Sequence, residues 1–130
     1  MRIFFSHAKQ LYGTPTEKKQ LGMIKDHFPA DSVVVDPGLV EDPSAGPEKE
    51  IQYFLRLVDQ CDAVVFSRYR GVVTSGVSQE VNYAISKGKP VFELRSGGRI
   101  VQVKQATRSS KIDALLFVAK DSVAGMFQKA

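Results

Sequence analysis

The sequence has a single cysteine, Cys61, so it cannot form a disulfide within the chain, which suits a reducing compartment. Apolar runs such as residues 63–66 are far shorter than the roughly 20 residues that a membrane-spanning helix needs. The first residues also lack the long apolar region and the small-residue cleavage site of a secretory signal peptide. We therefore expect a cytoplasmic protein with no membrane partner, in which Cys61 is a small core residue.

Recognisable metal and phosphate patterns are also missing. The two histidines, His7 and His27, and the acidic residues show no metal-ligand spacing, so we predict no metal. There is no G-x-G-x-x-G fingerprint and no P-loop, and the pair at residues 97–98 predicts only a turn. We therefore expect no cofactor.

The charge balance is only mildly basic. Eighteen Lys and Arg residues face 14 Asp and Glu residues, for a net charge of +4. A nucleic-acid interface gathers basic residues on one element, often with interleaved aromatics, whereas here they are scattered. We expect no nucleic-acid partner and a mild attraction for small anionic molecules.

What the sequence does contain is a regular alternation of short apolar runs with amphipathic stretches. This pattern is typical of a parallel sheet covered by helices. The 130 residues, 43% of them hydrophobic, suit one globular domain spanning residues 1–130. We predict an α/β fold, a flavodoxin- or Rossmann-like three-layer sandwich with about five parallel strands in the order 2-1-3-4-5.

The expected elements follow from apolar periodicity and from capping signals. The predicted strands are residues 2–6, 32–36, 62–67, 90–94 and 114–118. Helices are predicted to begin at Pro15, at Pro47 and at Ser75 or Gly76, with a closing helix over residues 122–128. Residues 100–103 fit either a further short strand or part of a helix. The loop over residues 37–47 is long for a compact domain, and such loops are more often functional than idle.

The segment at residues 70–81 joins the third strand to a helix and is rich in glycine and hydroxyl residues. It lies at the edge where ligands bind in open α/β sheets, and free amides at a helix start can hold an anion. Glu80 is expected in about the first turn, where the helix dipole favours the ionised carboxylate that attack on a sugar carbon requires. Glutamate is also common at such positions simply because it complements the dipole.

The stretch GVSQEVNYA at residues 76–84, followed by GKPV at residues 88–91, resembles the signature of nucleoside 2-deoxyribosyltransferases. It is equally similar to their relative, the 2'-deoxynucleoside 5'-monophosphate N-hydrolase. QCDAVV at residues 60–65 matches the third strand of that family, and RIFFS at residues 2–6 matches its first strand. The resemblance follows the element order of nearly the whole chain and is specific over residues 60–94.

This resemblance implies that the chain hydrolyses or transfers the N-glycosidic bond of a nucleoside or nucleoside 5'-monophosphate. Glu80 would be the nucleophile that forms a glycosyl-enzyme intermediate, and Tyr12 would approach the sugar or the nucleophile. Ser6 would line the base pocket. The resemblance also implies a homodimer or larger oligomer, for which Tyr53 and Phe54 on the second helix offer an apolar contact.

Further substrate contacts are expected in the same segment, at Gly71, Ser75, Gly76 and Ser78. The resemblance implies that Ser75 and Ser78, with the nearby amides, hold the 5' end of the nucleoside or its phosphate. His7 is a candidate acid for the leaving base, or else a hydrogen-bonded structural residue.

One departure from the family pattern keeps other functions open. Family members carry an aspartate that holds the sugar in the helix before the third strand, whereas QYFLR at residues 52–56 contains no acid. Glu48 and Glu50 are the nearest acids in that helix. The same fold can therefore be a nucleotide-binding sensor module without turnover. A third interpretation is a TIR-like domain that cleaves NAD, suggested weakly by Ser6 and His7 at the strand end.

Overall fold

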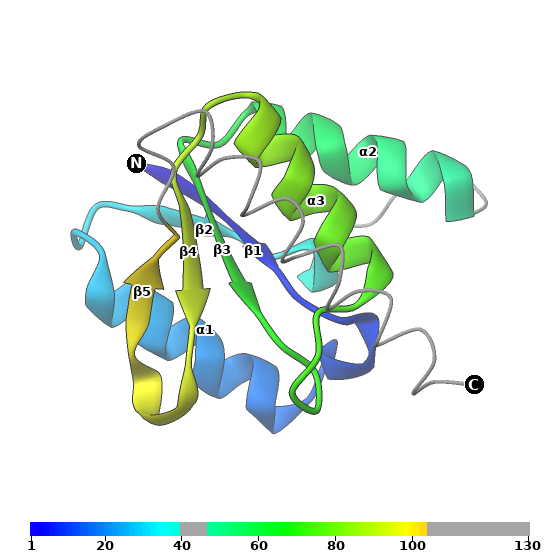
Figure 1. Ribbon diagram of the computed structural model, residues 1–130. Coiled ribbons are helices and arrows are strands. Elements are labelled where there is room, and N and C mark those ends of the chain that lie inside the picture. The colour runs from blue at the N-terminus through cyan, green and yellow to red at the C-terminus, as the bar shows by residue number, and fades with distance from the viewer. Residues whose placement is uncertain (40–46, 104–130) are drawn as a thin grey trace.

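The computed structural model describes residues 1–39 and 47–103, which form a five-stranded sheet covered by helices (Figure 1). The strands are β1 (Arg2–Ser6), β2 (Val33–Val35), β3 (Ala63–Ser67), β4 (Val91–Leu94) and β5 (Ile100–Gln102). The α-helices are α1 (Pro15–His27), α2 (Pro47–Asp59) and α3 (Ser75–Ser86). Short 3-10 turns follow three of the strands: η1 (Lys9–Leu11), η2 (Pro37–Leu39) and η3 (Ser96–Gly98).

The strand order is β2-β1-β3-β4-β5, as predicted, and the α/β sandwich is confirmed. Helix α1 covers one face of the sheet, while α2 and α3 cover the other (Figure 1). β3 lies in the middle and is buried at every position, which is what a parallel strand covered on both faces requires.

Alternate residues of the central strands feed two separate cores. Phe4, Val64 and Phe66 pack with the apolar sides of α2 and α3. Ile3 and Val65, one position away on the same strands, pack with residues of α1. Because side chains alternate between the faces of a strand, one continuous apolar run fills both layers.

The fifth strand corrects the prediction of an all-parallel sheet. β5 is formed by residues 100–102 and pairs with β4 in the antiparallel sense, with Glu93 opposite Val101. Only the short turn at η3 separates the two strands, and a parallel neighbour would need a long crossover connection. The strand predicted at residues 114–118 and the helix predicted at residues 122–128 lie outside the described residues.

The start of α1 follows its capping signal. The backbone N–H of Glu17 donates to the Thr14 hydroxyl oxygen at 3.3 Å, and Pro15 occupies the first helical position. Cys61 is buried, as expected of a core residue, and burial raises the pKa of its thiol. Over the described ranges, no helix is long and apolar enough to cross a membrane.

Candidate functional site

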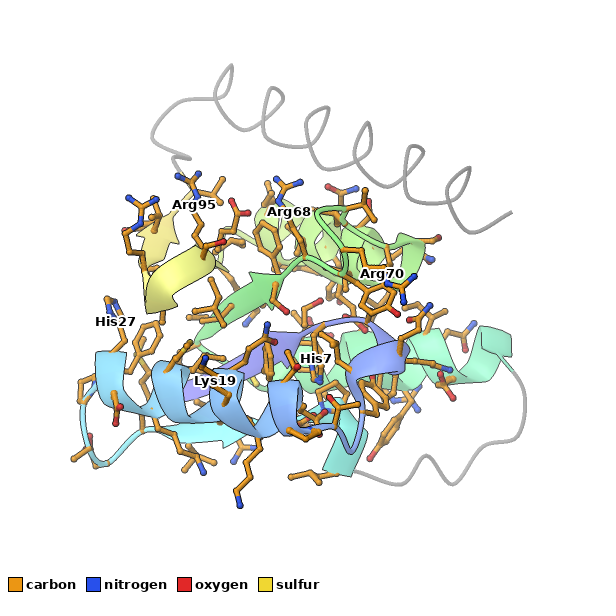
Figure 2. The ribbon with its side chains drawn as sticks, turned by 90° about the horizontal axis from the view of Figure 1, so that it is seen from below. His7, Lys19, His27, Arg68, Arg70 and Arg95 are labelled. Carbon is orange, nitrogen blue, oxygen red and sulfur yellow. The ribbon has the colours of Figure 1, made fainter. Side chains whose placement is uncertain are left out.

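A cavity of about 560 Å³ opens at the carboxyl edge of the sheet, between η1 and the facing ends of α2 and α3. Figure 2 views the molecule from this edge, with His7 near the centre. Most of the predicted site residues line this cavity: His7, Tyr12, Ser75, Gly76 and Glu80. The cavity volume lies within the range of small-molecule sites.

Glu80 lies in the second turn of α3 and is 4% exposed, although its side chain reaches the cavity wall. The Ser6 hydroxyl donates to Glu80 Oε1 at 2.6 Å, which ties the end of β1 to α3. Burial raises the pKa of Glu80 to about 8, while the Ser6 hydrogen bond and the Lys9 charge lower it by less. The helix dipole was expected to favour the ionised carboxylate, but the loss of water on burial is the larger effect and favours the neutral form.

Ser6 is fully buried and does not line the cavity. Its hydroxyl is directed at Glu80, so it positions the carboxyl and does not form the wall of a base pocket. Ser6 therefore lies next to the predicted site, but it contacts Glu80 and not the cavity that a base would occupy.

Two further predicted residues do not line this cavity. Ser78 is buried on α3 and accepts a 3.5 Å hydrogen bond from Asn82 Nδ2. It lies two positions from both Gly76 and Glu80, and the period of 3.6 residues per turn directs it to the opposite side of the helix. Gly71, at φ 79°, lines a different cavity at the end of β3.

Tyr12 shares the cavity with Glu80, and its ring centroid lies 5.0 Å from that of His7. Burial is the main cause that raises the pKa of Tyr12, followed by the negative charge of Glu80. The hydroxyl therefore stays protonated at neutral pH and can donate a hydrogen bond to an oxygen of a ligand.

His7 lines the cavity but uses both ring nitrogens within the protein. Nδ1 lies 3.0 Å from the carbonyl oxygen of Phe5, which can only accept, so Nδ1 carries a hydrogen. Nε2 lies 2.6 Å from Glu17 Oε2 and 3.6 Å from Asp36 Oδ1. This geometry favours the structural interpretation of His7 over a role as acid for the leaving base.

His7, Glu17 and Asp36 form a buried cluster whose ligand-type atoms lie within 4.8 Å of one another. One imidazole nitrogen and two carboxylates are groups that can hold a divalent cation, and a shared proton can also bridge His7 and Glu17. The sequence spacing did not reveal this cluster because its members come from the end of β1, from α1 and from the residue after β2. Burial raises the pKa of Asp36, and the amide of Gly38 opposes this by donating to Oδ1 at 2.7 Å.

An ion pair between Lys9 and Glu50 lies at the cavity and was not predicted. Glu50 lies on α2, just before residues 52–56. Helix α2 therefore does bring an acid to the cavity, and this acid is one of the two that lie nearest to that segment in the sequence. Ile51 and Phe54 add an apolar wall. Phe54 is 5% exposed and packs into the core. The expectation that Phe54 offers an exposed apolar contact to a second copy of the chain is therefore wrong.

Comparisons with known proteins support the fold and no more. No protein-family model matches the chain, and no curated protein is similar enough in sequence to match. The structure is similar to the crystal structure of a conserved protein from Enterococcus faecalis V583, with a TM-score of 0.60 and 21% sequence identity. The match covers 94% of this chain and 78% of the other.

Proposed function

We propose that the chain binds a nucleoside or nucleoside 5'-monophosphate beside Glu80 and cleaves or transfers its N-glycosidic bond. The observation that carries the proposal is the Glu80 carboxyl, held by Ser6 at the wall of a ligand-sized cavity. A carboxyl that is buried, oriented by a neighbour and open to a cavity on one side is typical of a catalytic acid or nucleophile.

The surroundings of Glu80 suit the parts of a nucleotide. Ile51 and Phe54 offer an apolar wall for a base, and the protonated hydroxyl of Tyr12 can donate to a sugar oxygen. The first turn of α3 supplies Ser75 and Gly76 at the positive end of a 12-residue helix, where a 5'-hydroxyl or phosphate is stabilised.

In the proposed reaction an oxygen of ionised Glu80 forms a bond to C1' of the sugar while the N-glycosidic bond breaks. The electron pair of that bond goes to the base nitrogen, which takes up a proton from solvent water as the base leaves. Water or a second base then attacks C1' and releases Glu80, giving hydrolysis or transfer. The attacking form is ionised, so ligand binding or higher pH must first remove the proton from Glu80.

The test is incubation of the purified protein with deoxynucleosides, deoxynucleoside monophosphates and NAD, followed by chromatography for free base. Glu80→Gln keeps the shape and loses the nucleophile, so base release should fall at least about a thousandfold. Ser78→Ala is the matched control, because Ser78 is buried on the same helix and faces away from the cavity. Full activity of Glu80→Gln, with the fold kept by circular dichroism, would sink this mechanism.

A second candidate is nucleotide binding without turnover. The burial that raises the pKa of Glu80 to about 8 favours it, because a neutral carboxyl binds a polar ligand without attacking it. Residues 52–56 also lack the acid that the family pattern expects. Absence of base release from every substrate, together with nucleotide-dependent thermal stabilisation, would establish this function in place of catalysis.

Self-association is also proposed, on the family resemblance alone. Tyr53 is half-buried on α2 and remains partly available to a neighbouring copy. Light scattering on a size-exclusion column should give a multiple of 14.4 kDa, and a mass near 14.4 kDa would exclude the oligomer.

A further inference from the structure

A second cavity of about 510 Å³ lies at the same sheet edge, between α1, the end of β3 and the turn at η3. Four of its lining residues are cationic and one is acidic: Lys19, Arg68, Arg95, Arg99 and Glu93. We call these five residues the cationic basin. The acidic member leaves an excess of three positive charges around one hollow.

The single acid of the basin holds two arginines in place. Glu93 is 6% exposed, and each of its oxygens accepts from a different guanidinium. Arg68 Nε donates to Oε2 at 2.7 Å, and Arg95 Nε donates to Oε1 at 3.3 Å. Figure 2 shows Arg68 and Arg95 on one side of this edge of the molecule, with Lys19 across from them on α1. Positioned guanidinium groups lose little entropy when they bind an anion.

The other two cations, Lys19 and Arg99, add positive charge to the basin that Glu93 does not balance. Lys19 and Arg99 are exposed at the rim, and neither has an acidic partner within residues 1–39 and 47–103. They come from different elements, α1 and the turn before β5, which converge on one opening. Like charges brought together in a concave site attract an anion and repel one another in its absence.

We infer that the cationic basin is a second ligand site that binds a small molecule carrying two or more phosphate groups. Guanidinium groups match phosphate oxygens through paired N–H donors, and an excess of three charges suits a di- or triphosphate. Met23 and Leu94 supply apolar surface in the same hollow for an attached organic group. This inference does not rest on the proposed reaction, because the basin shares no lining residue with the Glu80 cavity.

The test is calorimetric titration with inorganic pyrophosphate and with ADP, which separates the bare phosphate chemistry from a nucleotide source. One ligand should bind per chain, and the affinity should fall at least about tenfold in the double variant Lys19→Gln/Arg99→Gln. These two residues are chosen because removing Arg68 or Arg95 would take a hydrogen-bond donor away from the buried carboxylate of Glu93. Circular dichroism and the thermal unfolding midpoint check that the double variant keeps its fold.

The matched control is Lys18→Gln/Arg70→Gln, which removes the same charge from exposed residues outside the basin. It should bind both probes within about twofold of the unchanged protein, and so should Glu80→Gln. An equal loss of affinity in the control would show that the effect comes from the overall charge of the protein, and this result would overturn the inference. Loss of binding in Glu80→Gln would place the anion in the other cavity, which also overturns it. So would absence of binding, or tighter binding of a single-stranded oligonucleotide than of either probe.

Discussion

Glu80 is almost completely buried and also lines a cavity wall. Its burial and its proposed role favour opposite protonation states of the carboxyl. Burial favours the neutral carboxyl, whereas the proposed attack on a sugar requires the carboxylate. The Ser6 hydroxyl donates to Oε1, which favours the ionised form without removing the effect of burial. In the proposed function, the protonation state of this one residue therefore decides between turnover and simple binding.

The first prediction concerns the pH dependence of base release. With a pKa of about 8, the ionised fraction of Glu80 rises roughly tenfold per pH unit below that value. The rate constant should therefore increase between pH 6 and pH 8 and level off above it, as measured in single-turnover experiments. A rate that decreases across this range would show that Glu80 acts as a proton donor, not as a nucleophile.

The second prediction concerns Ser6. Ser6→Ala removes the hydrogen bond that lowers the pKa of Glu80, so the midpoint of the rate profile should move to higher pH. An unsatisfied buried acceptor should also cost about 1–3 kcal/mol of unfolding free energy. Ser86→Ala is the control, since its hydroxyl bonds the Tyr83 carbonyl at an exposed position. An unchanged midpoint in Ser6→Ala would disprove the positioning role.

At the scale of elements, the described structure follows the apolar periodicity of the sequence closely. β1 coincides with the predicted residues 2–6, and α3 begins at Ser75 as expected. β5 runs antiparallel because the turn before it is too short for a crossover. Local patterns fix the type of an element, whereas strand direction depends on connection length and pairing.

The sequence predicted a site residue correctly only where its place follows from the position of its own strand or helix. Glu80, Tyr12 and the start of α3 meet because strand ends and helix starts share one edge. The substrate role of Ser78 was implied by the family resemblance, whereas its position on α3, two residues from both Gly76 and Glu80, directs it to the opposite side of the helix. The burial of Glu80 arises from packing between distant elements, which no spacing along the chain encodes.

The third prediction concerns the start of α1. Thr14→Ala removes the acceptor for the Glu17 amide and the 2.5 Å hydrogen bond to the Leu11 carbonyl. The free energy of unfolding should fall by about 0.5–2 kcal/mol, measured by urea denaturation. Thr14→Ser keeps the hydroxyl and should lose little. A loss as large in the serine variant would show that the methyl group, not the cap, is responsible.

At the scale of the whole molecule, two cavities open on one sheet edge and differ in character. The cavity beside Glu80 is bordered by η1, α2 and α3, whereas the cationic basin is bordered by α1, β3 and η3. The sheet between them is packed on both faces by separate cores. One sheet therefore supports two cavities of different chemistry.

The fourth prediction concerns stability against pH. Between about pH 4.5 and pH 8 the unfolded chain ionises Glu80 while the folded chain keeps its proton, so unfolding becomes progressively easier. The unfolding free energy of the unchanged protein, relative to Glu80→Gln, should fall by roughly 5 kcal/mol across that range and stay level above it. Chemical denaturation at a series of pH values measures this difference.

The control for this measurement is Asp26→Asn, which changes an exposed acid on α1. Its unfolding free energy should follow that of the unchanged protein at every pH. A constant difference between the unchanged protein and Glu80→Gln would show that Glu80 titrates alike in the folded and unfolded chains. That result would contradict the burial of its carboxyl.

The hydrogen bond between Ser6 and Glu80 joins residues 74 positions apart. A ribosome therefore finishes β1 long before the partner of Ser6 exists, and the Glu80 carboxyl is oriented only once α3 has docked on a completed β1–β3 pair. The loop that this contact closes is long, so its formation belongs to late, non-local folding. Recovery of ligand binding after dilution from denaturant should consequently report the assembly of the entire sheet and not the formation of any one helix.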